Sequence, residues 1–288
     1  MVGALAVLLA AREAGLGGRV GGVTWERRVV DPIPGARRAA EIEDAGALVP
    51  GAVLAGPETA GPGGFRFAES HMARLLGEPV LLVDPNPGPR AVAAALDAAA
   101  ERLGCDAVAL VDVGGDVLAH GGEPGLASPL CDSILLAAAL HMRTPAVGAV
   151  FGPGCDGELT QAEVLERVAE VAAAGGLLGA WGITPAALER LDAAVAAVPT
   201  EASAQALRCA RGETGRAEIR GGRRSVELSP VGALTFLFDP AAAIASAARL
   251  AAAVAHAGSL DEAQEVLSAR GVRTELDWER EMAVAGAP

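Results

Sequence analysis

The sequence predicts a mixed α/β protein built on a doubly wound, mostly parallel sheet of the Rossmann-like type. Two short apolar runs, Val80–Val83 and Ala107–Val111, enclose an amphipathic helical stretch, Arg90–Leu103. This strand–helix–strand order is typical of a parallel sheet. A third apolar run, Thr144–Phe151, follows another helical stretch. We therefore expect helices on both faces of one sheet, with 80–83 and 107–111 as strands of that sheet.

The segment before this unit also alternates helix, strand and loop. Glycines end the first helical stretch, and proline and glycine interrupt the polar segment that follows the first strand. That polar segment is long for a connection, and such loops are commonly functional. The expected elements are a helix at 2–14, a strand at 19–24, a loop at 25–38, a strand at 53–55, a loop at 61–64 and a helix at 68–76.

The remainder of the chain is interpreted in the same way. No internal repeat or disordered linker composition divides it, so we expect one α/β domain. Residues 1–159 form its Rossmann-like core, and 160–288 form an appended C-terminal α+β part. The expected elements are helices at 130–142, 160–174 and 185–198, short strands at 218–220, 225–228 and 234–238, and helices at 240–256 and 260–269.

Composition excludes several classes of function. The chain has 288 residues and a net charge of −13, and all of its 23 basic residues are arginine. The lack of lysine excludes Schiff-base chemistry and a P-loop lysine. The acidic balance argues against nucleic acid and anionic membranes as partners. Four cysteines without a C-x-x-C pair and no apolar run of about 18 residues indicate a cytoplasmic protein.

Carboxylates directly follow three of the predicted strands. Asp112 and Asp116 flank Gly114-Gly115 after one strand, Asp156-Gly157-Glu158 follows another, and Glu26 follows the first. Asp84 ends a fourth strand. The carboxyl ends of parallel strands meet at one edge of a sheet. We therefore expect Glu26, Asp112, Asp116, Asp156 and Glu158 to converge on a single cleft, where repulsion raises the pKa of Asp116 or Asp156.

These residue types suit acid–base catalysis, binding of a hard cation or recognition of hydroxyl groups. As catalytic groups we expect Asp112, Asp116, Asp156 and Glu158, and as ligands of a metal, if one is used, the three aspartates. Flanking residues are candidates for binding substrate: Trp25, Glu26, Arg27, Arg37, Gly114, Gly115, Glu123, Ser128, Asp132 and Gly157. The alternative is that each acid merely caps its own helix or turn. His120 is the one histidine placed for acid–base work, and a loop residue without a role is the alternative for it.

Two functions from different classes fit these residues. The first is an enzyme of hydrolase or lyase type that acts on a small polar metabolite such as a sugar, a nucleoside or a phosphorylated compound. The second is a nucleotide-binding regulatory module without catalysis, in which the glycine loops only hold the ligand. The sequence leaves the cofactor open, with a divalent cation or a nucleotide as the candidates. The partner expected in both cases is a small molecule.

Several stretches resemble one known family. They are Gly22-Val-Thr-Trp-Glu-Arg27, Val111-Asp-Val-Gly-Gly-Asp116, Glu123-Pro-Gly-Leu-Ala-Ser-Pro-Leu-Cys-Asp132, Gly154-Cys-Asp-Gly-Glu-Leu159 and Gly271-Val-Arg-Thr-Glu-Leu-Asp277. Together they span nearly the whole chain, and it resembles the DUF1152 family, archaeal and bacterial proteins of uncharacterised function. The resemblance therefore implies no established reaction.

The resemblance also implies a strand and a glycine-rich loop before the helix that starts Val2-Gly-Ala-Leu5, whereas here Met1 directly precedes that helix. With such a loop, Glu26 would lie about 20 residues after the glycines, which is the geometry of dinucleotide binding. Without it, the first helix would expose apolar surface at an open sheet edge. We expect the chain to be an excerpt of a longer one, or to form a homo-oligomer that covers this edge.

Overall fold

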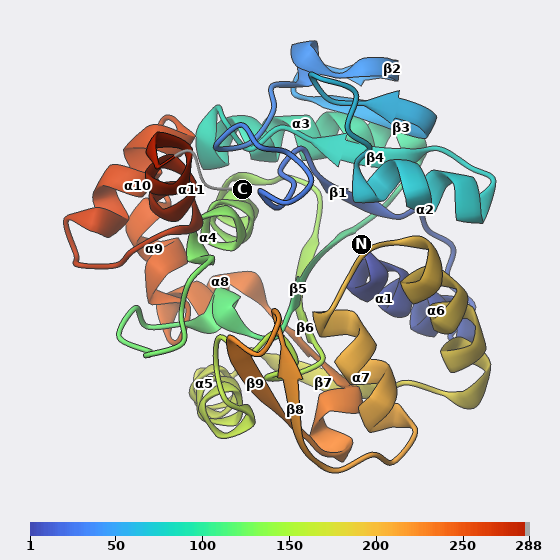
Figure 1. The fold of residues 1–288 in the computed structure, drawn as a ribbon, viewed down its shortest axis with the longest axis vertical. Helices are drawn as coiled ribbons and strands as arrows, with labels where there is room; N and C mark the ends of the chain where they lie inside the picture. The colour runs from blue at the N-terminus through green and yellow to red at the C-terminus, as the bar shows by residue number, and fades with distance from the viewer. Residues whose placement is uncertain (286–288) are drawn as a thin grey trace.

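Two four-stranded sheets organise the protein in the computed structural model, which describes residues 1–285 (Figure 1). The first, sheet A, has the order β1-β4-β3-β2. Strands β1 and β4 are parallel, with Val23 opposite Val83, and the other neighbours are antiparallel. Its strands are β1 (Gly21–Val23), β2 (Glu43–Val49), β3 (Ala52–Ala60) and β4 (Val80–Val83).

The second sheet, sheet B, has the order β5-β6-β10-β7. Strands β5 and β6 are parallel, with Asp112 opposite Val150, and β10 runs antiparallel to both of its neighbours. Its strands are β5 (Val108–Val113), β6 (Ala146–Phe151), β7 (Leu177–Gly182) and β10 (Leu234–Phe238). A separate antiparallel hairpin consists of β8 (Gly215–Ile219) and β9 (Arg224–Leu228).

Helices cover both faces of sheet B. Figure 1 shows α4 and α8–α11 on one side of it and α1, α6 and α7 on the other. In β6, Val150 belongs to the apolar core on the α4 side and Phe151 to the core on the α1 side, because successive strand residues point to opposite faces. The helices are α1 (Val2–Glu13), α2 (Ala68–Leu76), α3 (Gly88–Leu103), α4 (Pro129–Ala138), α5 (Gln161–Ala173), α6 (Pro185–Ala197), α7 (Ala202–Ala210), α8 (Pro240–Ala245), α9 (Arg249–Val254), α10 (Leu260–Ser268) and α11 (Glu275–Val284).

Helix α1 lies between the two sheets at its first turn. A Cβ atom at Gly3 would lie 2.7 Å from Val113 Cγ2 of β5, so glycine is required for this close approach. Next to it, the sulfur of Met1 lies against Gly22 of β1. The apolar side chains of α1 are buried against β5, β6 and α6. The expectation that this helix exposes apolar surface is therefore wrong.

The α/β class is confirmed, but the arrangement of the strands differs from the prediction. Strands β4 and β5 belong to different sheets, so the expectation that 80–83 and 107–111 share one parallel sheet is wrong. An apolar run shows that a strand is buried but does not name its neighbour. The β2–β3 hairpin pairs with β4 on the side away from β1, so both edges of β4 are occupied. Strand β5 is therefore in the other sheet, and α3, which connects β4 to β5, joins the two sheets. The C-terminal part is not simply appended, because β7 and β10 complete sheet B.

Most expected helices and strands lie within a few residues of the observed ones. The helix expected at 240–256 is divided into α8 and α9, where Ser246 Oγ donates a 2.7 Å hydrogen bond to the carbonyl of Ala242. Hydroxyl groups of this kind compete with helical hydrogen bonding. The sequence analysis did not identify β2, β7, α7 and α11. None of the helices within residues 1–285 is both long and apolar enough to cross a membrane.

Candidate functional site

Five carboxylates from three segments form one group, which we call the carboxylate cluster: Asp112, Asp116, Asp132, Asp156 and Glu158. Asp112 lies near the end of β5, and Asp116 opens the short 3₁₀ helix Asp116–Leu118 that follows. Asp156 and Glu158 lie in the loop after β6, and Asp132 lies in the first turn of α4. Because β5 and β6 are parallel neighbours, their carboxyl ends lie about 4.8 Å apart.

Glycine allows the two loops to approach one another. Gly114 has a φ of +119°, and a Cβ atom there would lie 2.1 Å from the carboxyl carbon of Asp156. Its backbone carbonyl also accepts a 2.7 Å hydrogen bond from the N–H of Gly154. Gly115 and Gly157 have φ values in the same left-handed region. The Gly-Gly pair is therefore needed to seat the Asp156 carboxylate beside the end of β5.

The carboxylate oxygens form two overlapping groups of three. One oxygen from each of Asp112, Asp116 and Asp132 lies within 4.8 Å of the others. The same holds for Asp116, Asp156 and Glu158. The Oδ2 atoms of Asp112 and Asp116 are buried and have no hydrogen-bond partner, and these two residues are only 6% and 3% exposed. Buried carboxylate oxygens without donors are costly, and proteins rarely retain them without a use.

Burial and mutual repulsion perturb these carboxyl groups. Burial, together with the charges of Asp132 and Asp156, raises the pKa of Asp112 well above its usual value. Burial and the neighbouring Asp112 do the same to the pKa of Asp116. Burial and the charge of Glu158 raise the pKa of both Asp132 and Asp156 to about 7. At neutral pH the cluster therefore holds protons that ordinary aspartates have lost.

Glu158 differs from the other members because donors surround it. Its Oε2 accepts 2.7 and 2.8 Å hydrogen bonds from the backbone N–H groups of Ala127 and Ser128. Its Oε1 accepts a 2.5 Å bond from Ser128 Oγ and forms a 2.9 Å ion pair with Arg224. Glu158 is thus already satisfied, and it fixes the loop that leads into α4. Ser128 acts through this carboxylate, since its side chain does not cap α4.

Three arginines lie on one side of the cluster, and we call them the arginine group: Arg27, Arg220 and Arg224. Burial and the charges of Arg27 and Arg224 lower the pKa of Arg220, so the three guanidinium groups lie within electrostatic range of one another. Arg224 pairs with Glu158, and Arg220 lies 3.5 Å from a carboxylate oxygen of Glu201. No hydrogen bond or ion pair within residues 1–285 involves the side chain of Arg27, which is half-buried.

Glu26 lies near a second carboxylate, Glu69, which no pattern in the sequence indicated. The Glu26 carboxylate accepts a 2.5 Å hydrogen bond from the backbone N–H of Ala68, at the start of α2. Burial and the charge of Glu26 raise the pKa of Glu69 to about 8, and Glu69 Oε2 has no hydrogen-bond partner. The α-amino group of Met1 lowers the pKa of Glu26, Glu69 and Asp132, which places the pair beside the cluster but not within it.

Trp25 is held by a hydrogen bond and by core packing, so its ring is not free to stack on a ligand. Its indole N–H lies 3.2 Å from both carboxylate oxygens of Glu279, and its ring packs against the core on the α4 side. Glu275, in the same helix α11, accepts hydrogen bonds from the N–H groups of Leu130 and Cys131 at the start of α4. The first N–H groups of α4 are therefore used by protein carboxylates and are not available to an anion.

Two residues expected near the site have structural roles elsewhere. Arg37 forms a buried 2.8 Å ion pair with Asp31 and donates to backbone carbonyls of the 33–35 loop, so its guanidinium group is already held by the protein. Glu123 accepts hydrogen bonds from the N–H groups of His120 and Gly121, so it is a turn residue.

Two other candidates also turn away from the cluster. The Asp84 carboxylate binds N–H groups of Ala39 and Asn86. His120 Nε2 lies 3.0 Å from Glu170, in a network with Arg167. Both residues are therefore used in local structure. Within residues 1–285, the acids brought together at the ends of β5 and β6 are those of the carboxylate cluster.

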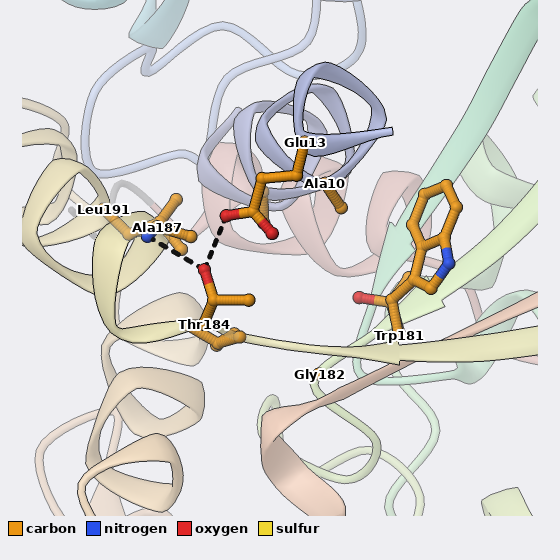
Figure 2. Close-up of a pocket in the computed structure, with 10 residues that line it drawn as sticks. Ala10, Glu13, Trp181, Gly182, Thr184, Ala187 and Leu191 are labelled. Atoms are coloured by element: carbon orange, nitrogen blue, oxygen red, sulfur yellow. Dashed lines mark hydrogen bonds between the residues drawn. The ribbon is translucent and has the colours of Figure 1, made fainter. Parts of the chain in front are cut away.

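A small pocket elsewhere in the fold is distinct from this site. Figure 2 shows the space between α1 and α6, lined by Ala10, Glu13, Trp181, Thr184 and Leu191 among others. The hydroxyl of Thr184 donates a 2.6 Å hydrogen bond to Glu13. The pocket has a volume of about 10 Å³, which holds no more than about one water molecule. It lies at the opposite end of α1 from Met1 and offers no room for a metabolite.

Comparison with known proteins gives a family but no activity. A family model described as a protein of unknown function, DUF1152, matches residues 1–283. No curated protein matches the chain, and no solved structure matches it. The function has to be inferred from the carboxylate cluster and its surroundings.

Proposed function

Since the chain belongs to the DUF1152 family, for which no function is established, we propose from its site that it is an enzyme of hydrolase or lyase type acting on a small phosphorylated metabolite. One observation supports this most strongly. Buried, closely spaced carboxylates with unpartnered oxygens lie at the ends of two parallel strands, beside a group of three arginines. Acid–base groups and an anion-binding group are thereby within reach of one ligand.

The carboxyl groups suit proton transfer at neutral pH. Asp132 and Asp156 have a pKa of about 7, raised by burial and by Glu158, so each can give or take a proton near physiological pH. Asp132 is partly exposed and Asp156 is buried, which makes Asp132 the member that a ligand meets first. We assign the acid–base role to Asp156, contact with the ligand to Asp132, and the positioning of the 127–128 loop to Glu158.

The arginine group favours a phosphorylated substrate over a neutral sugar or nucleoside. Guanidinium groups bind phosphate oxygens in a bidentate manner. In a chain with a net charge of −13, three neighbouring arginines make a local anion-binding surface against the overall charge. Within the described residues the Arg27 side chain makes no hydrogen bond, although its charge acts on the Glu26 carboxylate, so it is the first candidate to hold such a group.

The proposal also includes the Rossmann-like arrangement of strands that the sequence predicts. Strands β1, β5 and β6 are each followed by a charged residue of the site region, namely Glu26, Asp116 and Asp156. A Rossmann-like relation between the two sheets would bring these three carboxyl ends to one ligand. That relation supports a nucleotide-like or sugar-phosphate substrate, and it predicts binding at the ends of β1, β5 and β6.

Release of inorganic phosphate from a panel of sugar phosphates and nucleotides tests the proposal, with and without Mg²⁺ or Mn²⁺. We expect turnover by the native chain, a loss of about 100-fold or more in Asp156→Asn, and weaker substrate binding in Arg27→Gln. The exposed residues Asp106 and Arg90 give matched controls, Asp106→Asn and Arg90→Gln, which should leave turnover unchanged.

Two results would contradict the proposal. One is turnover that survives unchanged in Asp156→Asn and Asp132→Asn. The other is a nucleotide that stabilises the protein against heat, equally in both variants, with no product formed from any member of the panel. The second result would support the regulatory nucleotide-binding module in place of the enzyme.

A further inference from the structure

We propose that Asp112, Asp116 and Asp132 bind one divalent cation of the hard, oxygen-preferring kind, Mg²⁺ or Mn²⁺. Carboxylates are the ligands that these ions prefer. The proposal deepens the proposed function, on which it rests for its chemical use. The metal site itself stands on the contacts and charges of these three residues.

The first observation is the pair of unpartnered oxygens. Asp112 Oδ2 and Asp116 Oδ2 are fully enclosed and accept no hydrogen bond, although both residues are more than nine-tenths buried. Asp132, across from them in α4, supplies the third oxygen of the group. A buried carboxylate is normally held by donors or by a metal. Neither oxygen accepts a hydrogen bond within the described residues, although the N–H of Val117 and the carboxyl group of Asp116 both face Asp112, and a cation would serve the two oxygens at once.

The second observation is the charge balance. The cluster brings five carboxylates together, and the cations that face it are Arg220, Arg224 and the α-amino group of Met1. Arg224 is paired with Glu158. The remaining acids therefore repel one another, and a divalent ion would compensate two of their charges at once.

The spacing also suits a single ion. Oxygens bound to Mg²⁺ at about 2.1 Å lie at most about 4 Å from one another across the ion. The three oxygens lie within 4.8 Å, and since at most one of their three pairs can be opposite across the ion, a contraction of up to about 2 Å brings the adjacent pairs to about 3 Å. Asp116 and Asp112 are fixed by β5 and the turn after it, whereas the partly exposed Asp132 has room to adjust.

The second group of three oxygens is a poorer site. Glu158 already accepts hydrogen bonds from Ala127, Ser128 and Arg224, so binding a metal would cost these contacts. Asp156 retains one weak contact, 3.3 Å from the N–H of Glu158. We therefore place the ion at Asp112, Asp116 and Asp132, with Asp156 beside it as a free acid–base group.

Titration of the full chain with Mn²⁺, followed by the loss of the signal of free Mn²⁺ in electron paramagnetic resonance, tests this site directly. At about pH 8, where the acids with a pKa of about 7 are ionised, we expect one bound ion per chain. Asp112→Asn and Asp132→Asn should each weaken binding by more than about tenfold. The control Asp106→Asn should bind as the native chain does.

Folding is monitored separately. Removing one charge from the cluster relieves repulsion, so both variants should unfold in EDTA at a temperature equal to or above that of the native chain. Their loss of Mn²⁺ binding is then a loss of ligands. Should Asp112→Asn fail to fold, the partly exposed Asp132 decides the matter alone.

The proposal is overturned if the native chain binds no Mn²⁺ below roughly 1 mM, the weak end of protein sites for hard cations. It is equally overturned if both variants bind Mn²⁺ as tightly as the control. Its failure is distinct from that of the proposed function. Phosphate release by a chain that binds no Mn²⁺ removes the metal site and keeps the enzyme, whereas Mn²⁺ binding without turnover of any compound keeps the site and removes the enzyme.

Discussion

Two buried aspartates, Asp97 in α3 and Asp112 in β5, are both 6% exposed and yet have opposite properties. Asp97 accepts hydrogen bonds of 2.9–3.1 Å from the backbone N–H groups of Arg143 and Thr144. Burial raises its pKa, but these donors outweigh burial and lower the pKa to about 2. Asp112 has an oxygen without a donor, and burial and neighbouring acids raise its pKa.

The difference shows that burial alone does not identify a functional acid. What separates the two regions is the supply of donors together with depth, because Asp97 borders an open surface pocket with Arg143 and Thr144, whereas Asp112 is enclosed. The loop at 143–144 points N–H groups at Asp97, whereas the region around Asp112 supplies further carboxylates. The first arrangement stabilises the fold, and the second stores unfavourable interactions that a ligand can relieve.

The largest expected effect is that substitutions at Asp97 and at Asp112 change the free energy of unfolding in opposite directions. Asp97→Ala should lower the free energy of unfolding by about 3 kcal/mol, because the lowered pKa reports a net stabilisation and the N–H groups at 143–144 lose their acceptor. Asp112→Asn should leave stability in EDTA unchanged or increase it. Urea unfolding measures both, and an equal loss in the two variants would remove the distinction between the regions.

Glu158 sharpens the comparison from inside the cluster. It resembles Asp97 in its donors, since Ala127, Ser128 and Arg224 all bind it. Glu158→Gln should therefore cost about 2 kcal/mol of stability, a typical value for hydrogen bonds to a charged group. Asp156→Asn, next but one in the chain, should cost less than half of that. Similar losses at both positions in urea unfolding would show that donors do not divide the cluster.

The pH dependence of stability should follow the same division. Folding raises the pKa of Asp132 and Asp156 to about 7, so the folded state binds more protons than the unfolded one between about pH 4 and pH 7. The metal-free protein should thus lose stability as pH rises through this window, on the order of several kcal/mol, since each pKa unit corresponds to about 1.4 kcal/mol. The charges that face these two acids are Asp112, Asp116, Glu158, Arg224, Glu275 of α11 and the α-amino group of Met1.

Asp97 acts in the opposite sense, because its pKa is lowered. Its contribution is present above about pH 4 and is lost as pH falls through about 2. Urea unfolding at about pH 5 and pH 8 in EDTA separates the two effects. In Asp132→Asn the loss between these pH values should shrink. A native chain that is more stable at the higher pH would be incompatible with raised pKa values in the cluster.

The smallest effect is expected at Ser128. Its hydroxyl donates to Glu158 Oε1, while its backbone N–H donates to Oε2 of the same carboxylate. Ser128→Ala removes only the first of these contacts and should cost about 1 kcal/mol. Turnover should persist, since Ser128 acts as a positioning residue. A complete loss of turnover with unchanged stability would instead make the hydroxyl a catalytic group.

The sequence predicted which acids form the cluster better than it predicted the partners of the residues around them. Asp112, Asp116 and Asp156 could be found because acids that follow buried strands lie at one edge of a parallel sheet. The partners of Arg37 and Glu123 could not be found, since each depends on loop conformation. Arg224 reaches the site through a hairpin that is distant in sequence, and no local pattern indicates where a hairpin packs.

The division into two sheets was not predictable for a related reason. The runs at β4 and β5 have the apolar pattern of buried strands, and both were recognised. Which strands pair is decided by tertiary contacts, here by the β2–β3 hairpin that occupies one side of β4. The strand β7, with its two glycines, and the helix α11, rich in charge, lack a clear pattern of their own and depend on packing.

The most direct test of the distinction between donor-held and donor-free acids is a crystal structure of the protein with Mn²⁺, using anomalous diffraction to locate the ion. We predict one strong peak within about 2.2 Å of oxygens of Asp112, Asp116 and Asp132, and none at Asp97 or Glu158. Unchanged carboxylates with no peak among them, at a Mn²⁺ concentration that saturates the protein in solution, would contradict the claim that these acids form a cation site.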